Sequence, residues 1–389
     1  MSAITFSADS LEVFFDARHR TLGEHLRSVL PSGLTAVDGP AAVARDMGRL
    51  GLYRYLVPEA LGGASVGKPS DPAYVDVRSL VTIREALGQT SALADAIFAV
   101  QGLGSYPISI AGSAAQKARY LPDVLTGDRI GAFALTEPEA GSDIASMQTT
   151  AQRSGDDWLI EGEKTLISNV GIASHYVVFA NADPTAGRKG ISTFLIDADA
   201  PGLIASPLAL SSPHPLGHLR FVGCRVPDSS RLGEVGRGLP LALETLDAFR
   251  ISVGAAANGM ASLALSESIR RVTRRRQFGA PLAEQQMIQA YIAEMATDLE
   301  AARLLVARAA HTRDTLGGRV TTEAAMAKMF ATEAAQRIID KAVQIHGGSG
   351  VLSGSVIEAL YRDIRPLRIY EGTTEIQKVV IARALLKTR

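Results

Sequence analysis

The sequence predicts a mainly α-helical protein with a central β domain. Apolar residues recur at three- and four-residue intervals from residue 10 to about 130, and again from about 239 to the end. Between these regions, short β-rich runs alternate with Gly, Pro, Asp and Asn. A chain of 389 residues is also too long for one compact core. We therefore expect a helical domain over 1–130, a β domain over 131–238 and a helical bundle over 239–389.

The helices of the first region are predicted by "DSLEVFFDARHRTLGEHLRSVL" and "AAVARDMGRLGLYRYL", where apolar residues return once per helical turn. A further stretch, "SLVTIREALGQTSALADAIFAVQGLGSYPI", has the pattern of one helix followed by a mostly apolar, buried one. At residue 131 the pattern changes, because "GAFALTEPEAGSD" is typical of an apolar strand that runs into a turn. Short antiparallel strands are then expected at "DWLIEGEKTLIS", "HYVVFANA", "ISTFLIDA" and "LRFVGCRV".

The last region predicts long helices of a bundle. "LALETLDAFRISVGAAANGMASLALSESIRRVTRRR" contains no proline and many alanines. Pro281 is expected to begin the next helical segment, since proline suits the first turn of a helix. Gly347 and Gly348 are expected to end the helix that contains "EAAMAKMFATEAAQRIIDKAVQIHG".

Composition excludes several classes of protein. Lys plus Arg number 40 and Asp plus Glu number 40, so overall charge gives no reason to bind nucleic acid or an anionic membrane. The single cysteine, Cys224, excludes an intrachain disulfide and a cysteine-based zinc site. No secretory signal and no apolar run of membrane-spanning length is evident. We expect a cytoplasmic protein without a metal site.

Four stretches are candidates for chemistry, and each has a simpler explanation. "LTEPEAGSD" (135–143) offers hydroxyls and a glycine to a ligand, but also fits an ordinary turn. "RRVTRRRQFG" (270–279) suits phosphate, but also fits a solvated basic face or a nucleic-acid patch. "QIHGGSG" (344–350) fits a phosphate loop or a helix end. "RIYEGTTEIQ" (368–377) places Glu371 either in a helix cap or as a general base.

In this order, and over this arrangement of helices and strands, the stretches resemble the acyl-CoA dehydrogenase family. The resemblance covers nearly the whole chain and rests on "ALTEPEAGSD", "GEKTLISN", "RRRQFGAPLAEQQ", "QIHGGSG" and "YRDIRPLRIYEGTTEIQ". It implies an N-terminal helical domain, a middle antiparallel β-barrel and a C-terminal four-helix bundle. It also implies FAD as cofactor, an acyl-CoA substrate, an electron-transfer flavoprotein as partner, and a homotetramer built as a dimer of dimers.

The resemblance assigns roles to individual residues. Those implied to contact FAD are Leu135, Thr136, Ser142, Leu166, Ser168, Arg275, Phe278, Gln286, Gln344, Gly347, Gly348, Thr373 and Glu375. Those implied to contact the acyl-CoA are Ser142, Asp247, Arg250 and Gly372.

Glu371 is implied to be the catalytic base, which removes the α-proton of the thioester while a hydride leaves the β-carbon for FAD. Bound acyl-CoA is expected to exclude water from Glu371 and to raise its pKa. The family has a second position for the base, but Phe249 occupies it here, so the assignment falls on Glu371 alone. Gly372 would let the backbone approach the thioester closely.

Two departures from the family pattern leave the substrate and the electron acceptor open. Leu166 replaces the usual tryptophan over the flavin, and Ser168 replaces the more common threonine. An acyl-CoA oxidase, other thioester chemistry on the same fold, and a non-catalytic flavin-binding protein are therefore the alternatives. No motif specifies the acyl group. Residues 89–110 contain no arginine, which disfavours a dicarboxylyl thioester.

Overall fold

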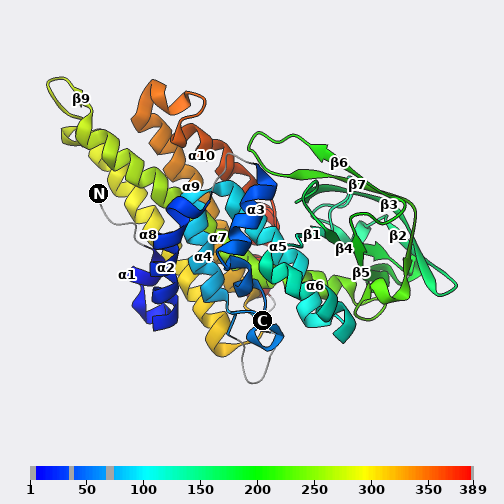
Figure 1. Ribbon diagram of the computed structural model, residues 1–389. Helices are drawn as coiled ribbons and strands as arrows, with labels where there is room; N and C mark the ends of the chain where they lie inside the picture. The colour runs from blue at the N-terminus through cyan, green and yellow to red at the C-terminus, as the bar shows by residue number, and fades with distance from the viewer. Residues whose placement is uncertain (1–5, 35–38, 67–73, 387–389) are drawn as a thin grey trace. The chain divides into compact units, whose positions relative to one another are not determined.

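The structure is a computed structural model that describes residues 6–34, 39–66 and 74–386 of the chain (Figure 1). Within it the chain forms two compact units. The first comprises residues 1–31, 77–95 and 250–389, and the second comprises residues 32–76 and 96–249. The expected domain boundaries at 130 and 238 stay a prediction, because this division follows compactness rather than chain order.

The first unit is helical. Its main helices are α2 (Ala17–Gly33, as far as Pro31), α4 (Val77–Thr90), the second part of α7 (Gly238–Arg274), α8 (Gln286–Leu316), α9 (Thr321–His346), α10 (Val356–Ile364) and α11 (Thr374–Leu386). The short helices α1 (Ser7–Ser10), η1 (Glu12–Phe14), η8 (Leu282–Glu284), η9 (Gly347–Val351) and η10 (Arg365–Arg368) connect them. Buried alanines of α7, α8 and α9 form much of its core, so these long helices pack closely.

Two glycines allow α4 and α7 to cross in contact. A Cβ on Gly88 of α4 would lie 2.3 Å from the backbone oxygen of Ala256, and one on Gly259 of α7 would lie 2.1 Å from that of Glu85. Any side chain at either position would therefore push the two helices apart. This close crossing fixes the part of α4 that carries Arg84 against α7.

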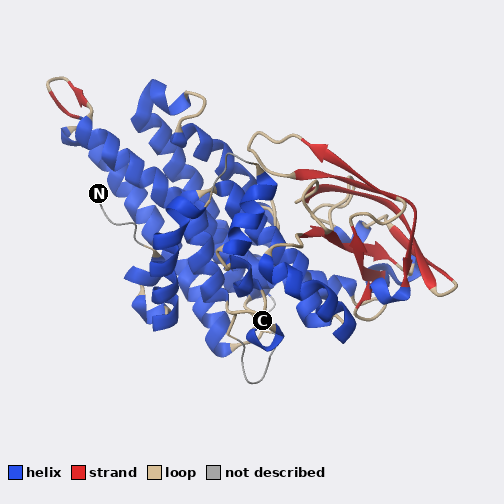
Figure 2. Cartoon of the chain, in the orientation of Figure 1, coloured by secondary structure: helices blue, strands red, loops and turns tan. Residues whose placement is uncertain are grey.

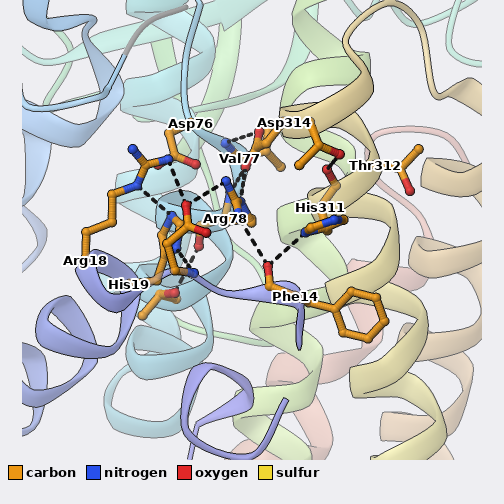
Figure 3. A network of polar contacts seen from close by, with 12 residues as sticks. Phe14, Arg18, His19, Asp76, Val77, Arg78, His311, Thr312 and Asp314 are labelled. Carbon is orange, nitrogen blue, oxygen red and sulfur yellow. Dashed lines mark hydrogen bonds and ion pairs between the residues drawn. The ribbon is translucent and has the colours of Figure 1, made fainter. Parts of the chain in front are cut away.

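The start of α4 is capped by another helix (Figure 3). The carboxylate of Asp314 on α8 accepts hydrogen bonds from the backbone N–H groups of Val77 (3.1 Å) and Arg78 (3.0 Å). It also accepts one from Nε of Arg78 at 2.9 Å. The backbone oxygen of Phe14 lies 3.2 Å from Nη1 of Arg78 and 3.2 Å from Nδ1 of His311. A buried carboxylate thus satisfies two of the free N–H groups of the first helical turn.

The second unit combines helices with an eight-stranded sheet (Figure 2). Its helical elements include α3 (Pro40–Arg49), η3 (Leu52–Leu56), η4 (Glu59–Leu61), the greater part of α5 (Ala92–Ala111), α6 (Ala114–Thr126), the short helices η5 (Ile144–Ser146), η6 (Pro184–Gly190) and η7 (Asp228–Ser230), and the first part of α7. The strands are β1 (Gly131–Ala134), β2 (Thr150–Ser154), β3 (Asp157–Ser168), β4 (His175–Asn181), β5 (Ile191–Asp197), β6 (Leu203–Leu208), β7 (Leu216–Pro227) and β8 (Arg231–Leu232). Their order is β6-β7-β3-β2-β4-β5-β8, and β1 pairs with β4. Trp158 and Phe194, with ring centroids 5.4 Å apart, pack edge to face in its core.

Three details differ from the expectations. The sheet is not wholly antiparallel, because β1 pairs with β4 in parallel, and Thr150 of β2 pairs with Asn181 of β4 in parallel. The strands β2 and β6 were not expected, since "TAQRS" and "LIASPL" lack a strong apolar alternation. Pro281 ends the hairpin of β9 (Arg276–Gln277) and β10 (Ala280–Pro281) and is the N-cap of the short helix η8, whereas the long helix α8 begins only at Gln286. Gly347 follows the last residue of α9, as predicted.

Candidate active site

Glu371 lies in a strained loop between η10 and α11. Its φ is 52° and that of Gly372 is 89°, so both residues are in the left-handed region. Residues with a side chain rarely adopt this region, because it is energetically unfavourable for them. The neighbouring residues must therefore impose the backbone conformation of Glu371. The cap of α11 is a different residue, because Oγ1 of Thr373 accepts a hydrogen bond from the N–H of Ile376 at 3.3 Å. Glu371 is therefore not the helix cap.

Side chains from three helices hold the backbone of this loop. The carbonyl of Glu371 accepts hydrogen bonds from Nε of Arg250 on α7 (3.2 Å) and from Nε2 of Gln377 on α11 (3.3 Å). The carbonyl of Gly372 accepts from Nζ of Lys328 on α9 (2.8 Å) and again from Gln377 (2.9 Å). Two successive carbonyls are thus satisfied by buried donors, and the strained conformation is fixed from several sides.

The carboxylate of Glu371 itself is left without such a partner. Its Oε2 atom is buried and has no hydrogen-bond partner among the described residues. Burial raises the pKa of Glu371, and the positive charges of Arg84, Arg250 and Lys328 act in the opposite direction. Burial also lowers the pKa of Lys328 to about 8. A carboxylate whose pKa is raised binds a proton more strongly than an ordinary one, which makes it a better proton acceptor.

Asp247 and Arg250 lie one turn apart on α7 and are both buried. Between them Phe249 is fully buried, and its ring packs edge to face on Tyr106 of α5 with centroids 5.8 Å apart. A Cβ at Gly102 would lie 2.1 Å from the Phe249 ring, so α5 leaves room for this aromatic side chain only by having glycine there. Phe249 fills space and offers no proton acceptor.

A second group of predicted residues lies on the sheet. Lys164 of β3 is fully buried, and its Nζ lies 2.7 Å from Oε1 of Glu137 and 3.3 Å from the carbonyl of Leu135. The N–H of Thr165 donates to the carbonyl of Thr136 at 2.9 Å. The loop that follows β1 is therefore pinned to β3. Ser142, farther along this loop, is exposed.

The end of β3 presents Leu166 and Ser168 in an irregular stretch. The pairing of β3 with β7 shifts register between Lys164 and Ile167, and Leu166 has φ 55° with 58% of its surface exposed. Oγ of Ser168 lies 2.7 Å from Nε2 of His214. Burial lowers the pKa of His214 to about 4, so this imidazole is neutral at physiological pH. An exposed apolar side chain and an oriented hydroxyl thus lie close together on one strand.

The arginine-rich stretch lines a hollow in the first unit. The hollow has a volume of about 400 Å³ and is lined by Glu267, Arg270, Arg271, Arg274, Arg275 and His346. Nη2 of Arg271 donates to the carbonyl of His346 at 3.3 Å, which joins the end of α7 to the end of α9. The structure therefore brings together the arginine stretch and the glycine-rich stretch, which are far apart in the sequence. Four guanidinium groups on one hollow suit a phosphorylated ligand.

The remaining predicted contacts lie near the ends of helices. Phe278 is in the β9–β10 hairpin (Figure 1), with φ 51° and 95% of its surface exposed, and Gln286 is the first residue of α8. Gln344 is in the last turn of α9. Apart from chain neighbours, no atom of the described residues lies within 4 Å of a Cβ placed on Gly347 or Gly348. Thr373 and Glu375 flank the start of α11, where Glu375 is exposed.

Comparison with known proteins decides the family. Three acyl-CoA dehydrogenase family profiles match, describing the N-terminal domain over residues 24–128, the middle domain over 132–224 and the C-terminal domain over 236–386. The chain belongs to the acyl-CoA dehydrogenase family. It is an oxidoreductase, and FAD is the cofactor of the family.

Relatives of this family match over most of the chain. The human mitochondrial short-chain specific acyl-CoA dehydrogenase is 41% identical over 354 residues, which are 90% of this chain and 83% of that protein. Subunit CarC of the caffeyl-CoA reductase-Etf complex of Acetobacterium woodii is 37% identical, covering 90% of each chain. The solved structure of an acyl-CoA dehydrogenase complexed with FAD from Bacillus anthracis superposes with a TM-score of 0.87 at 28% identity, covering 96% of this chain and 68% of that one.

The residues present fit a bound FAD. The exposed Leu166 and the Ser168 hydroxyl suit the ring of a flavin, which is apolar on its face and accepts hydrogen bonds at its edge. The arginine hollow and the open space above Gly347 and Gly348 suit a pyrophosphate, because a charged fork and an accessible backbone both bind phosphate oxygens. The aromatic ring of Phe278 is exposed, so it suits contact with a planar group.

Some residues of these sites were not predicted from the sequence. Arg84 and Asp95, both fully buried, and Lys328 and Gln377 surround the Glu371 loop. Arg84 lies just before residues 89–110, which contain no arginine. The sequence did contain a signal for Arg84, because a charged residue among apolar residues of a helix is seldom buried unless it is paired. Sequence position alone, however, did not show which helix faces which.

We find no helix among the described residues that combines the length and apolar character needed to cross a bilayer.

Proposed function

We propose that this protein dehydrogenates a short acyl-CoA thioester to the 2-enoyl-CoA, with Glu371 as the catalytic base. One observation carries the proposal. Glu371 is a carboxylate on a strained loop, with one buried oxygen that has no hydrogen-bond partner among the described residues and a pKa raised by burial. Such an oxygen has free acceptor capacity, which an α-proton of a bound substrate would use.

The chain's own residues would then divide the work. Glu371 removes the α-proton, while Arg250 and Lys328 keep its loop in place through the two carbonyls. Gly372 would contact the thioester through its backbone, and Asp247, Arg250 and Ser142 would bind the CoA portion. FAD, when bound, supplies the two-electron acceptor for the β-hydride. The protein's own residues would contribute the positioning of the substrate and the electrostatic stabilisation of the charge that develops on it.

The residues of the cofactor site would act as two groups. Leu135, Thr136, Leu166 and Ser168 would hold the flavin end, with His214 orienting the Ser168 hydroxyl. Arg275, Phe278, Gln286, Gln344, Gly347, Gly348, Thr373 and Glu375 would hold the phosphates and the adenosine end. We further propose a cytoplasmic homotetramer built as a dimer of dimers.

Relatives support the substrate class and the electron partner. The human relative is named as short-chain specific, and CarC is named as part of a complex with an electron-transfer flavoprotein. We therefore propose a short acyl chain and an electron-transfer flavoprotein as acceptor. A dicarboxylyl chain stays disfavoured, because the guanidinium of Arg84 is already paired with Asp95 at 2.8 Å.

Reduction of an enoyl-CoA is the second candidate. It is favoured by the name of CarC, which belongs to a reductase. The same residue would act in reverse, since a carboxylic acid of raised pKa can deliver the α-proton that the base removes in the forward direction. The two candidates share a site and differ in the direction of proton and hydride transfer.

The test is an anaerobic titration of the purified yellow protein with acyl-CoAs of differing length and branching. We expect one of them to bleach the flavin in the wild type and not in Glu371→Gln. Glu358→Gln, which removes a carboxylate paired with Arg362 on α10, is the control and should bleach normally. A colourless protein that cannot be reconstituted with FAD, or a bleached Glu371→Gln, would contradict the proposal.

Two further arms separate the alternatives. Re-oxidation of the dithionite-reduced protein by an enoyl-CoA, faster than bleaching by the matching acyl-CoA, would favour the reductase. Rapid peroxide formation in air would favour the oxidase that the Leu166 departure keeps open.

A further inference from the structure

Arg84 and Asp95 form an ion pair inside the first unit. Arg84 is 0% exposed and Asp95 is 1% exposed. Both contacts are short, with Nε of Arg84 2.8 Å from Oδ1 of Asp95 and Nη2 2.8 Å from Oδ2. This is the paired arrangement in which guanidinium and carboxylate bind most strongly. The pair links α4, which carries Arg84, to the first turn of α5, which carries Asp95.

The pair is not explained by the needs of either helix. The start of α5 is capped by Ser91, whose Oγ accepts a hydrogen bond from the N–H of Ala94 at 3.2 Å, so Asp95 is not needed as a cap. Moving two charges out of water costs about as much free energy as their attraction returns, and an apolar pair of similar size is often as stable. A buried pair of this kind is therefore weak evidence for stability alone.

The remaining contacts of Arg84 lead to the base. Its Nη1 donates to Oγ of Ser252 on α7 at 3.1 Å, and Ser252 lies two residues after Arg250, whose Nε donates to the carbonyl of Glu371 at 3.2 Å. Arg84 is thus fixed on two sides, by Asp95 and by Ser252, and it anchors the segment of α7 that holds the Glu371 carbonyl. That carbonyl belongs to the residue with the strained backbone conformation.

The charges around Glu371 come from four helices. Arg84 on α4, Arg250 on α7 and Lys328 on α9 favour its ionised form, while Asp95 on α5 opposes it. Lys328 in turn interacts with Glu333 and Glu375 as well as with Glu371. Among the cations acting on Glu371, Arg84 has the largest effect, and its pairing with Asp95 moderates that effect.

We propose that Arg84 and Asp95 are a positioning pair for Glu371, which orient the base through Ser252 and Arg250 of α7 and set the net positive charge that it experiences. The inference rests on the proposed role of Glu371 as base. In this arrangement Asp95 keeps the guanidinium in place and partly neutralises it, and Ser252 completes the anchor. Neither Arg84 nor Asp95 contacts the substrate, so both act through another residue.

The experiment measures the ionisation of Glu371 without relying on turnover. Infrared difference spectra recorded during a pH titration of the FAD-loaded protein contain the carbonyl band of each protonated carboxyl group. The band that disappears in Glu371→Gln identifies the residue. Arg84→Gln removes a positive charge and should move the Glu371 midpoint to higher pH by about one unit or more. Asp95→Asn removes a negative charge and should move it to lower pH.

A matched pair on the same helix controls for general damage. Glu85 on α4 is also buried, and its Oε1 lies 2.9 Å from Nε of Arg303 on α8. Glu85→Gln and Arg303→Gln break a comparable ion pair, and we expect the Glu371 midpoint to stay at its wild-type value. The double variant Arg84→Gln/Asp95→Asn should have a midpoint between those of the wild type and Arg84→Gln, because Asp95 offsets only part of the larger effect of Arg84.

Ser252→Ala tests the positioning step separately. It keeps both charges and removes the hydroxyl that Arg84 binds, so kcat should fall about tenfold while KM changes little. It also remains informative if Arg84→Gln does not fold. Midpoints that shift in the same direction in Arg84→Gln and Asp95→Asn, or that do not shift, would overturn the inference. Full turnover in Glu371→Gln would instead refute the proposed function, while the infrared result would still decide the effect of the pair on Glu371.

Discussion

The Glu371 loop and the end of β3 contain the same kinds of residue but differ in how their carboxylates are paired. Each contains a non-glycine residue with positive φ, Glu371 at 52° and Leu166 at 55°. Each also contains a buried lysine that donates to a backbone carbonyl, Lys328 to Gly372 at 2.8 Å and Lys164 to Leu135 at 3.3 Å. Burial lowers the pKa of both lysines to about 8.

The difference lies in the carboxylates. At β3 the carboxylate of Glu137 lies 2.7 Å from Lys164 and accepts the N–H groups of Gln148 and Thr149, so its oxygens are satisfied. At the loop, Lys328 forms no ion pair among the described residues, and Oε2 of Glu371 has no hydrogen-bond partner there. A satisfied buried carboxylate holds structure, whereas one with free acceptor capacity is available for proton transfer.

The largest effect on stability is expected at the β3 pair. Lys164→Met leaves the Glu137 carboxylate buried without its cation and should lower the free energy of unfolding by about 3–5 kcal/mol. Denaturation with urea would measure this, and Lys164→Met/Glu137→Gln should recover a large part of it. A loss below about 1 kcal/mol would show that this pair is not the structural counterpart of the Glu371 loop.

At the loop, the corresponding change should affect turnover more than stability. Lys328→Met removes a charge whose burial is itself unfavourable, and Gln377 still donates to the Gly372 carbonyl. We expect kcat to fall about tenfold, with a change in the free energy of unfolding within about 1 kcal/mol. Lys341→Met, on the same helix and paired with Glu294, is the control. A large loss of stability with unchanged kcat would reverse the comparison.

A smaller effect is expected at Ser168. Ser168→Ala leaves Nε2 of His214 without its hydroxyl partner and should reduce kcat several-fold, at a cost of about 1 kcal/mol in stability. Ser168→Thr keeps the hydroxyl and should retain most of the activity. Equal losses in the two variants would argue against a role for the hydroxyl.

The pH dependence of stability should have opposite signs in the two regions. Burial places the pKa of His214 at about 4 instead of 6.5, so the unfolded chain binds more protons between these values and stability falls as pH falls. Burial raises the pKa of Glu371, so the folded chain binds more protons above pH 4.5 and this contribution is lost as pH rises.

Two variants separate these contributions. The excess stability of the wild type over His214→Asn should grow as pH rises from about 4 to 6.5. Its excess over Glu371→Gln should shrink as pH rises above 4.5. Thermal unfolding at several pH values measures both differences, and slopes of the same sign would remove this distinction between the regions.

The sequence by itself determined the order of helices and strands and the family. Helical spacing in α7 and alternation in β3, β4, β5 and β7 are local properties, and so are the stretches that carry Glu371, Ser168 and the arginines. These features depend on neighbours in the chain, which explains why they could be predicted. The strands β2 and β6 were missed because their pairing with longer strands, and not their own pattern, makes them strands.

Only the tertiary structure decided which charges meet Glu371. Arg84, Asp95 and Lys328 lie on α4, α5 and α9, and their approach to the loop depends on helix crossings such as the one at Gly88 and Gly259. The parallel pairing of β1 with β4 was decided in the same way. Electrostatic energy depends on distance and burial, and both are properties of the packed chain. A sequence identifies which residues can carry charge, but their effect on one another exists only once the helices have packed.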